Sequence, residues 1–525
     1  MHKKTDNQMA WHKLTATSNR RGFLRRTLAA GLAAGVTPAF LARMASAEEI
    51  KRGGVLRIAT TAPSAIDPHQ LQDPGGRATV QPVVNYLVHV TPDLKVVPEL
   101  ATEWSSDDAQ NWTVKLRQGV KFHNGRDFTA DDVVATFDRL VDPAVASAAR
   151  SAFSFLSKGK TIKIDDHTVR FELERKLGDF PYSLNTYQAA ILPADWPGDF
   201  AKNPIGTGPF KLKSYEPKQF AEYEKFDGYW EPGLPYLDGV RIDFFEDVAA
   251  QIAALQTGKA DLMQSIPLES VATLLPEENS ITVLSAPSST YAQLAMRVDQ
   301  APFNDKRVRQ ALAYCIDRDL LVGKLWSGYA QVGNDHLIAP VYPLSQGVKI
   351  EQRKQDYERA KKLLAEAGFP NGVDVELRTH PIFGLPQYAQ AVQEMAKPAG
   401  IRINLVVEQD DLYYQHWNTT PFALEAWIHR PSPGQLLNIG YRCGAEWNVP
   451  HWCNDAFDKL VSELDATVDE AKRSELAGQI AGIMNDDAPA IVAFFYETLR
   501  PIRNNVKGMA AEPTDFLNLR SVWLA

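Results

Sequence analysis

Cysteines and long apolar runs are scarce in this sequence, and its positive charges are outnumbered by negative ones. Three cysteines in 525 residues exclude a disulfide-dense scaffold and a Cys₄ zinc array. With 56 Lys+Arg against 64 Asp+Glu the net charge is −8, which argues against nucleic acid as the main partner because phosphate binding needs clustered cations. Beyond the N-terminal segment no stretch approaches the ~18 uncharged apolar residues typical of a membrane-spanning helix.

Catalytic motifs are also missing. The chain has no His-Glu-x-x-His and no Gly-x-Ser-x-Gly. Gly159-Lys160-Thr161 matches the end of a phosphate-binding loop, but Ser154 stands where the loop requires its first glycine. Triads assemble from distant residues, so these absences lower the expectation of an enzyme without excluding one. We expect a protein that is not an enzyme and needs no cofactor.

What is present is the composition of a large globular protein. Hydrophobic residues make up 45% and charged residues 23% of the chain, which excludes wholesale disorder. At about 150 residues per unit, the length suggests two to four structural units.

Residues 1–47 have the pattern of an export signal. They hold eight Lys or Arg and one Asp, so subtracting this +7 segment from −8 leaves −15 on the remainder. Arg20-Arg21-Gly-Phe-Leu is followed by an Ala/Leu/Gly-rich run and by Ala45-Ser-Ala47, the order of a cleavable signal peptide. The paired arginines favour twin-arginine export with cleavage after about Ala47, although Asn19 replaces the usual Ser or Thr. The alternatives are general secretion and a membrane-anchoring helix. We expect a periplasmic protein.

Export changes the interpretation of two cysteines. Cys443 and Cys453 flank a polar, Trp-rich segment, and in an oxidising compartment such a pair favours a disulfide. A metal site from these cysteines with His451 and perhaps His429 is the alternative, but its spacing fits no standard zinc pattern.

Hydrophobic periodicity indicates an α/β protein. In the first half, Trp112–Arg117 alternates like a strand, Val120–Phe122 suggests a second strand, and Thr129–Asp132 has the pattern of a capping box. In the second half, strand-like 373–377 and 401–407 enclose a helical segment, which predicts a βαβ unit with parallel strands.

Several motifs resemble one family in the same order along the chain. They are Arg52-Gly-Gly-Val-Leu-Arg57, Val97-Pro-Glu-Leu-Ala-Thr-Glu-Trp104, Leu116-Arg-Gln-Gly-Val-Lys-Phe-His-Asn-Gly125, Pro204-Ile-Gly-Thr-Gly-Pro-Phe210, Gly228-Tyr-Trp230, Phe303-Asn-Asp-Lys-Arg-Val-Arg-Gln-Ala-Leu312 and Ala360-Lys-Lys-Leu-Leu-Ala-Glu-Ala-Gly368. From about Gly53 to the C-terminus the chain resembles the extracytoplasmic solute-binding proteins of family 5, the dipeptide- and oligopeptide-binding proteins of ABC importers.

The resemblance implies a two-lobed periplasmic-binding-protein fold of type II that closes on a ligand. The first lobe would comprise residues 48–290, with an extra subdomain at about 84–202. The second would comprise 291–495, and 496–525 would return to the first lobe. The chain would be a monomer that captures a peptide or peptide-like solute and delivers it to a membrane permease powered by an ATPase.

The family's ligand motif is only partly present. Peptide-binding relatives have a Trp followed three residues later by an Asp that pairs with the peptide's ammonium group. Here Trp427 matches, but Arg430 stands at the position of the acid, with His429 beside it. A guanidinium suits a carboxylate or phosphate, which predicts a ligand with an anionic group. Alternatively, Arg430 pairs with a carboxylate of the protein.

The resemblance adds further candidates. Asp73 and Gly75 lie in a segment whose backbone approaches the peptide in relatives, although Pro-Gly alone also makes a turn. Trp447 and Asn448 follow Cys443 in a loop that covers the ligand in relatives; Trp447 would stack on a ligand or pack beside the cysteines. Trp427 itself is a site residue or part of the core.

The ligand remains open at this level. Besides peptides, opine-like conjugates, organic acids and nickel chelates fit the family. An exported enzyme on a two-lobed scaffold and a sensor that signals on closure are the alternatives in other functional classes.

Overall fold

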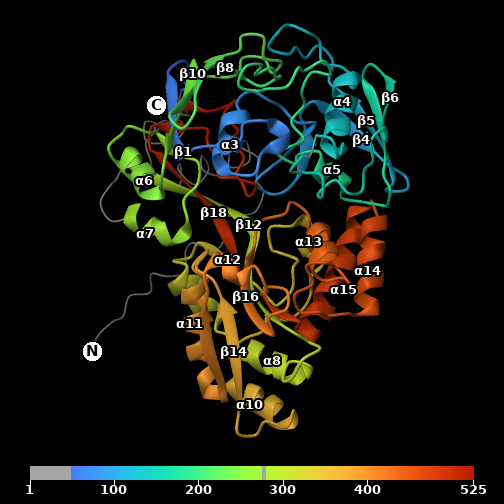
Figure 1. Ribbon diagram of the computed structural model, residues 1–525, viewed down its shortest axis with the longest axis vertical. Helices are drawn as coiled ribbons and strands as arrows, with labels where there is room; N and C mark the ends of the chain where they lie inside the picture. The colour runs from blue at the N-terminus through green and yellow to red at the C-terminus, as the bar shows by residue number, and fades with distance from the viewer. Residues whose placement is uncertain (1–48, 146, 275–279) are drawn as a thin grey trace, which may run out of the picture. The chain divides into compact units, whose positions relative to one another are not determined.

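The computed structural model describes residues 49–145, 147–274 and 280–525 (Figure 1). The predicted export signal, residues 1–47, lies outside the described residues. Among those described, no helix has the length and apolar content required to cross a bilayer.

A mixed sheet of twelve strands runs through the molecule. Its main path has the order β15-β14-β16-β12-β18-β11-β1-β10-β9-β8, with β13 and β17 paired to β18 and β12. The strands are β1 (Val55–Thr61), β8 (Phe210–Glu216), β9 (Phe220–Lys225), β10 (Gly239–Phe245), β11 (Leu262–Met263), β12 (Ile281–Met296), β13 (Ala330–Val332), β14 (Val373–Thr379), β15 (Ile401–Val407), β16 (Phe422–Trp427), β17 (Ala490–Ile491) and β18 (Phe494–Arg503).

The helices lie against this sheet and around a smaller one. They are α3 (Pro74–Val80), α4 (Ala130–Val141), α5 (Phe180–Ser183), α6 (Val248–Gln256), α7 (Val271–Leu274), α8 (Lys306–Cys315), α9 (Arg318–Leu320), α10 (Tyr357–Glu366), α11 (Leu385–Ala396), α12 (Asp410–Tyr413), α13 (Pro433–Gly440), α14 (Asp455–Ala466) and α15 (Glu470–Asp487).

The predicted βαβ unit is confirmed. Strand β14 pairs with β15 in parallel, from Val373 opposite Ile401 to Thr379 opposite Val407, and α11 connects them. The inward residues of both strands and one face of α11 belong to a single apolar core that also contains α8 and α10. This core is the centre of one lobe.

A separate four-stranded antiparallel sheet lies in the first half, in the order β4-β5-β7-β6. It comprises β4 (Ala101–Ser105), β5 (Asn111–Leu116), β6 (Thr161–Asp165) and β7 (Thr168–Glu172). The capping box predicted at Thr129 begins α4, which packs on this sheet. The strand predicted at Val120–Phe122 is wrong: its residues form only an isolated bridge, Lys121 with Asp127, because the turn at Gly125 returns the chain at once.

Two further pairs of short strands, β2 with β3 and β19 with β20, lie in the first half and at the C-terminus. The remaining strands are β2 (Val88–Val90), β3 (Val96–Pro98), β19 (Val506–Lys507) and β20 (Trp523–Leu524). The first lobe is built on β1, β8, β9 and β10, and its core includes side chains from the C-terminal segment after β18. The fold is therefore α/β with two lobes.

Strands β12 and β18 connect the two lobes. They pair antiparallel from Ile281 opposite Arg503 to Tyr291 opposite Phe495, and in Figure 1 they lie between the part with β1 and the part with β14. The register shifts between Pro287 and Tyr291, so β12 has a bulge there. Bulges bend a strand and redirect its side chains, and this one lies beside the candidate site described next.

Candidate functional site

His429 and Arg430 follow the end of β16 and are tied to the bulge of β12. The Ser289 hydroxyl donates to the carbonyl of Arg430 at 3.0 Å and accepts from its backbone N–H at 3.1 Å. The Thr290 hydroxyl accepts from the N–H of His429 at 3.0 Å, and the Tyr342 hydroxyl donates to the Arg430 carbonyl at 2.8 Å. These four hydrogen bonds fix the backbone of His429 and Arg430 and therefore the positions from which their side chains project.

The imidazole of His429 presents a free donor. The backbone N–H of Ser289 donates to its Nδ1 at 3.0 Å, so the neutral ring carries its proton on Nε2. That Nε2 is buried and has no hydrogen-bond partner among the described residues. Burial, with a smaller effect from the neighbouring Arg430 cation, lowers the pKa of His429 to about 3, so the ring is neutral at physiological pH.

The guanidinium of Arg430 has no carboxylate partner in the described part of the chain. Its one hydrogen bond there goes to the carbonyl of His429 at 3.2 Å. Burial lowers its pKa, and the groups that act in the opposite direction are phenols, those of Tyr187, Tyr342 and Tyr291. A largely desolvated cation without a counter-ion is costly, and a ligand anion would remove that cost.

Trp427 belongs to the wall beneath this pair. It is 8% exposed, stacks on Tyr291 with ring centroids 6.4 Å apart, and donates from Nε1 to the Glu425 carboxylate at 3.0 Å. Gln293 also donates to Glu425, at 2.5 Å. Burial raises the pKa of Glu425 to about 7. The structure therefore places Trp427 mainly in packing, with its neighbour Trp447 nearer to solvent.

A disulfide joins Cys443 and Cys453, whose Cα atoms are 4.5 Å apart. Because the two sulfurs are bonded to each other, neither is available as a thiolate ligand. Inside the loop, Asn448 bonds to the backbone of Arg442 and Trp452 and is buried, so its side chain holds the loop's shape. Trp447 is 41% exposed and touches Trp427 edge-on at 5.8 Å.

Asp73 and Gly75 have structural roles at the start of α3. The Asp73 carboxylate is the helix cap, accepting from the N–H of Gly76 at 2.7 Å and of Ser64 at 3.0 Å. A Cβ at Gly75 would lie 2.1 Å from the carbonyl of Thr61, so this position needs glycine for packing against β1. Among the described residues, the hydrogen bonds of the Asp73 side chain go to Ser64 and Gly76 and none goes to His429 or Arg430.

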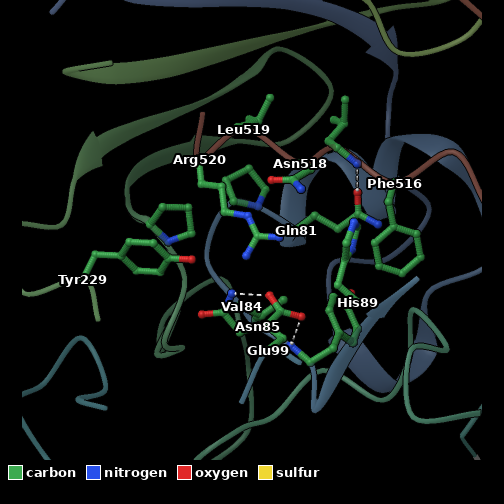
Figure 2. Close-up of a pocket in the computed structure, with 14 residues that line it drawn as sticks. Gln81, Val84, Asn85, His89, Glu99, Tyr229, Phe516, Asn518, Leu519 and Arg520 are labelled. Atoms are coloured by element: carbon green, nitrogen blue, oxygen red, sulfur yellow. Dashed lines mark hydrogen bonds between the residues drawn. The ribbon is translucent and has the colours of Figure 1, made fainter. Parts of the chain in front are cut away.

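Figure 2 shows a cavity whose lining residues include neither His429 nor Arg430. Its volume is about 40 Å³, and residues from the first half meet the C-terminal segment there, among them Asn85, Glu99, Tyr229 and Arg520. Asn85 donates to Glu99 at 2.6 Å, and burial raises the pKa of Glu99 to about 7. A volume of this size has room for a few water molecules and none for a dipeptide. The cavity is therefore a buried polar cluster of one lobe, distinct from the solute site.

Sequence reasoning missed the residues that orient the site. Ser289, Thr290 and Tyr342 lie 88 to 141 positions from His429 and Arg430, and no local pattern marks them. The Ser-Ser-Thr run at 288–290 is the one available signal, because small hydroxyl residues often satisfy backbone groups at irregular positions in strands.

Two lobes joined by β12 and β18, with free donors beside the connection, define a class of protein that binds solutes between lobes. The family model for bacterial extracellular solute-binding proteins, family 5, matches residues 95–447. The chain belongs to this family of solute-binding proteins, which are not enzymes.

Two curated relatives show the extent of the similarity. The dipeptide-binding protein of Escherichia coli is 28% identical over 455 residues, covering 80% of this chain and 84% of the relative. The glutathione-binding protein GsiB of Pectobacterium atrosepticum is 28% identical over 500 residues, covering 91% and 94%.

Solved structures have the same fold. The unliganded open form of the periplasmic murein tripeptide-binding protein MppA superposes with a TM-score of 0.80 at 22% identity, over 90% of this chain and 98% of that one. AppA from Bacillus subtilis with a nonapeptide gives 0.68 at 25% identity, over 91% and 100%. AgaA from A. tumefaciens with agropinic acid gives 0.69 at 25% identity, over 90% and 99%.

Proposed function

We propose that this chain is the periplasmic component of an ABC importer and captures a peptide-like solute through an anionic group of that solute. One observation carries the proposal: the Arg430 guanidinium is largely buried and has no carboxylate partner in the described residues. The Nε2 donor of His429, on the preceding residue, also has no partner in the part of the chain that the structure describes. A carboxylate can accept from both groups, whereas an ammonium group can accept from neither.

The ligands named for similar proteins support this chemistry. Relatives are named for dipeptides and glutathione, and a structural neighbour holds agropinic acid. Each of these compounds carries at least one carboxylate. In this chain Arg430 takes the position where peptide-binding members of the family have an acid, so the preference shifts from the amino end of a peptide to an acidic end or a blocked peptide.

The remaining elements of the proposal rest on the family and, for export, on the signal pattern of residues 1–47. The lobes, 48–290 with 496–525 and 291–495, close on the solute by bending at β12 and β18, and the extra subdomain is 84–202. Trp447 lies over the ligand, and Asn448 keeps its loop in place. The chain is exported by its twin-arginine signal, works as a monomer, catalyses no reaction and delivers the solute to a permease and ATPase.

The test compares acids with their amides. N-acetylated dipeptides with a free carboxylate and the matching amides are added to the purified chain after bound solute has been removed, and thermal unfolding is followed. A ligand at about 100 times its Kd stabilises the fold by about 2.7 kcal/mol. We expect acids to raise the unfolding temperature and amides to leave it unchanged.

Arg430→Gln is the diagnostic variant. Loss of a charge-assisted hydrogen bond costs about 1.5–3 kcal/mol, so the Kd for acids should rise at least about tenfold. Arg402→Gln is the matched control, because Arg402 pairs with Asp374 on an exposed strand edge. If free-amino peptides bind whether or not their carboxylate is blocked, and Arg430→Gln binds them equally, the proposal is wrong.

A further inference from the structure

Exposed apolar side chains gather beyond the carboxyl ends of three neighbouring strands. After β14 comes Phe383, after β15 comes Tyr414, and after β16 comes Ile428, which are 43%, 55% and 55% exposed. Val407 and Leu412, each 49% exposed, belong to the same set. We call these five residues the apolar wall. Single exposed apolar residues are ordinary, but a group at one edge of a sheet indicates a binding surface.

The sheet order brings the wall together. Strand β14 lies between β15 and β16 and is parallel to both, so all three strands end at the same edge. With neighbouring strands about 4.8 Å apart, the residues after β15 and β16 are separated by roughly 10 Å across the sheet. In α/β sheets, ligands bind beyond the carboxyl ends of the strands.

Ring contacts hold parts of the wall in place. His380, at the end of β14, stacks on Tyr413 at 4.3 Å and meets Tyr414 edge-on at 5.0 Å, while its Nδ1 bonds to Asp410 at 2.9 Å. These contacts fix the ring of Tyr414 although it is half exposed.

Phe383 is held in an unusual conformation. Its φ is +49°, a left-handed conformation that a bulky residue adopts at a cost, and its carbonyl accepts from the Tyr496 hydroxyl at 2.9 Å. Such strain at an exposed aromatic residue is typical of a functional position.

The wall begins beside the anion donors. Ile428 directly precedes His429 and Arg430, and the half-exposed Trp447 meets Trp427, the residue before Ile428, edge-on at 5.8 Å. The exposed apolar side chain of Ile428 is therefore the member of the wall that adjoins the anion donors in the sequence.

We infer that the solute is an amphipathic anion, an acid whose acyl or aryl portion rests on the apolar wall while its carboxylate binds Arg430 and His429. This inference rests on the proposed function and narrows its ligand class. Peptides with small polar side chains would leave the wall in water, whereas an acyl or aromatic substituent would bury it. Each methylene that becomes buried strengthens binding by up to about fourfold.

The experiment uses an N-acylglycine series with the full chain. N-acetylglycine, N-butyrylglycine and N-octanoylglycine, together with the amide of each, are titrated calorimetrically. We expect the Kd to fall at least about tenfold from the acetyl to the octanoyl acid, and no binding of the amides.

Two variants locate the effect. In the double variant Ile428→Ser/Tyr414→Ser the gain from acetyl to octanoyl should shrink to less than about threefold. Ile164→Ser removes an equally exposed residue, 52% against 55%, from β6 in the four-stranded sheet and should keep the full gain. Thermal unfolding of each variant without solute confirms that it is folded.

The outcomes separate this inference from the proposed function. No gain with acyl length in the wild type, or an undiminished gain in the double variant, overturns the apolar wall as a ligand surface, while Arg430-dependent binding of N-acetylglycine still upholds the proposed function. Equal binding of acids and amides, or no binding of any acid, overturns both.

Discussion

Glu425 is a buried acid that contacts Trp427. Its carboxyl group accepts from Gln293 and from Trp427, and it has no cation beside it in the described structure. Two hydrogen bonds do not offset its desolvation, so its pKa is raised to about 7 from an ordinary value near 4.5. The native state therefore binds a proton more tightly at this site than the unfolded chain does.

The raised pKa of Glu425 makes the unfolding free energy fall as the pH rises. A raised native pKa contributes stability that is complete below pH 4.5 and is lost as the pH rises through 7. Glu425→Gln keeps both hydrogen bonds and cannot ionise. Relative to the wild type, we expect this variant to gain about 3 kcal/mol in unfolding free energy between pH 4.5 and pH 8.

Urea unfolding at several pH values measures this difference. Glu174→Gln, at an exposed position, is the control and should give no such trend. A constant difference between Glu425→Gln and the wild type across this pH range would contradict the raised pKa.

At the scale of elements, the bulge of β12 joins the lobe connection to the site. Ser289 is fully buried in the bulge, and its hydroxyl bonds to both backbone groups of Arg430. If the lobes close as proposed, bending of β12 would move the backbone of Arg430, and a solute bound to its guanidinium would act on the bulge in return.

Ser289→Ala should weaken both the fold and the site. It leaves the N–H of Arg430 without an acceptor, which costs about 1–3 kcal/mol in unfolding free energy, and it loosens His429 so that affinity for acids falls. Ser285→Ala changes an exposed serine of the same strand and should cost less than about 0.5 kcal/mol. Equal stability and affinity of the two variants would exclude the coupling. Urea unfolding and calorimetric titration measure the two effects.

The elements that sequence predicted and those it missed differ in the range of their interactions. The strands β14 and β15 and the start of α4 at Thr129 were predictable because period and caps are local properties. The segment Val120–Phe122 has a suitable composition for a strand, but in the described structure its pairing is limited to the single bridge between Lys121 and Asp127. The bulge of β12 was beyond prediction, since it exists only through its pairing with β18, more than 200 residues away.

The same distinction applies to the site. Trp427, His429 and Arg430 were identifiable as candidates because they occupy a family motif. Their environment was not, because the partners Ser289 and Tyr342 and the missing counter-ion of Arg430 arise from tertiary packing. Asp73 and Gly75 matched the family pattern equally well. In the structure, however, Asp73 caps a helix and Gly75 permits close packing.

At the scale of the whole molecule, β18 completes the sheet. It pairs with β12 on one side and β11 on the other, so it joins the strands of the two lobes, and Arg500 within it is fully buried. Without β18 the edges of β12 and β11 lose their partners, and buried backbone groups remain unpaired.

A chain that ends at Ala493 should therefore fail to fold. We expect no cooperative thermal transition for this truncation, measured by circular dichroism, whereas the chain from residue 49 to 525 should unfold in one. A cooperative transition of the truncated chain near the temperature of the longer one would show that each lobe is stable without the joining strand.

The position of β18 near the C-terminus also means that β12 is synthesised long before the strand with which it pairs. The ribosome releases β12 roughly 200 residues before β18, which at about 5–20 residues per second is a delay of roughly 10–40 s. Through that interval the nascent chain carries a long strand with an open edge, the kind of surface on which chains aggregate. A chaperone that binds this unpaired edge would act during that interval. Its binding site would disappear when β18, in the last thirty or so residues, emerges and pairs with β12.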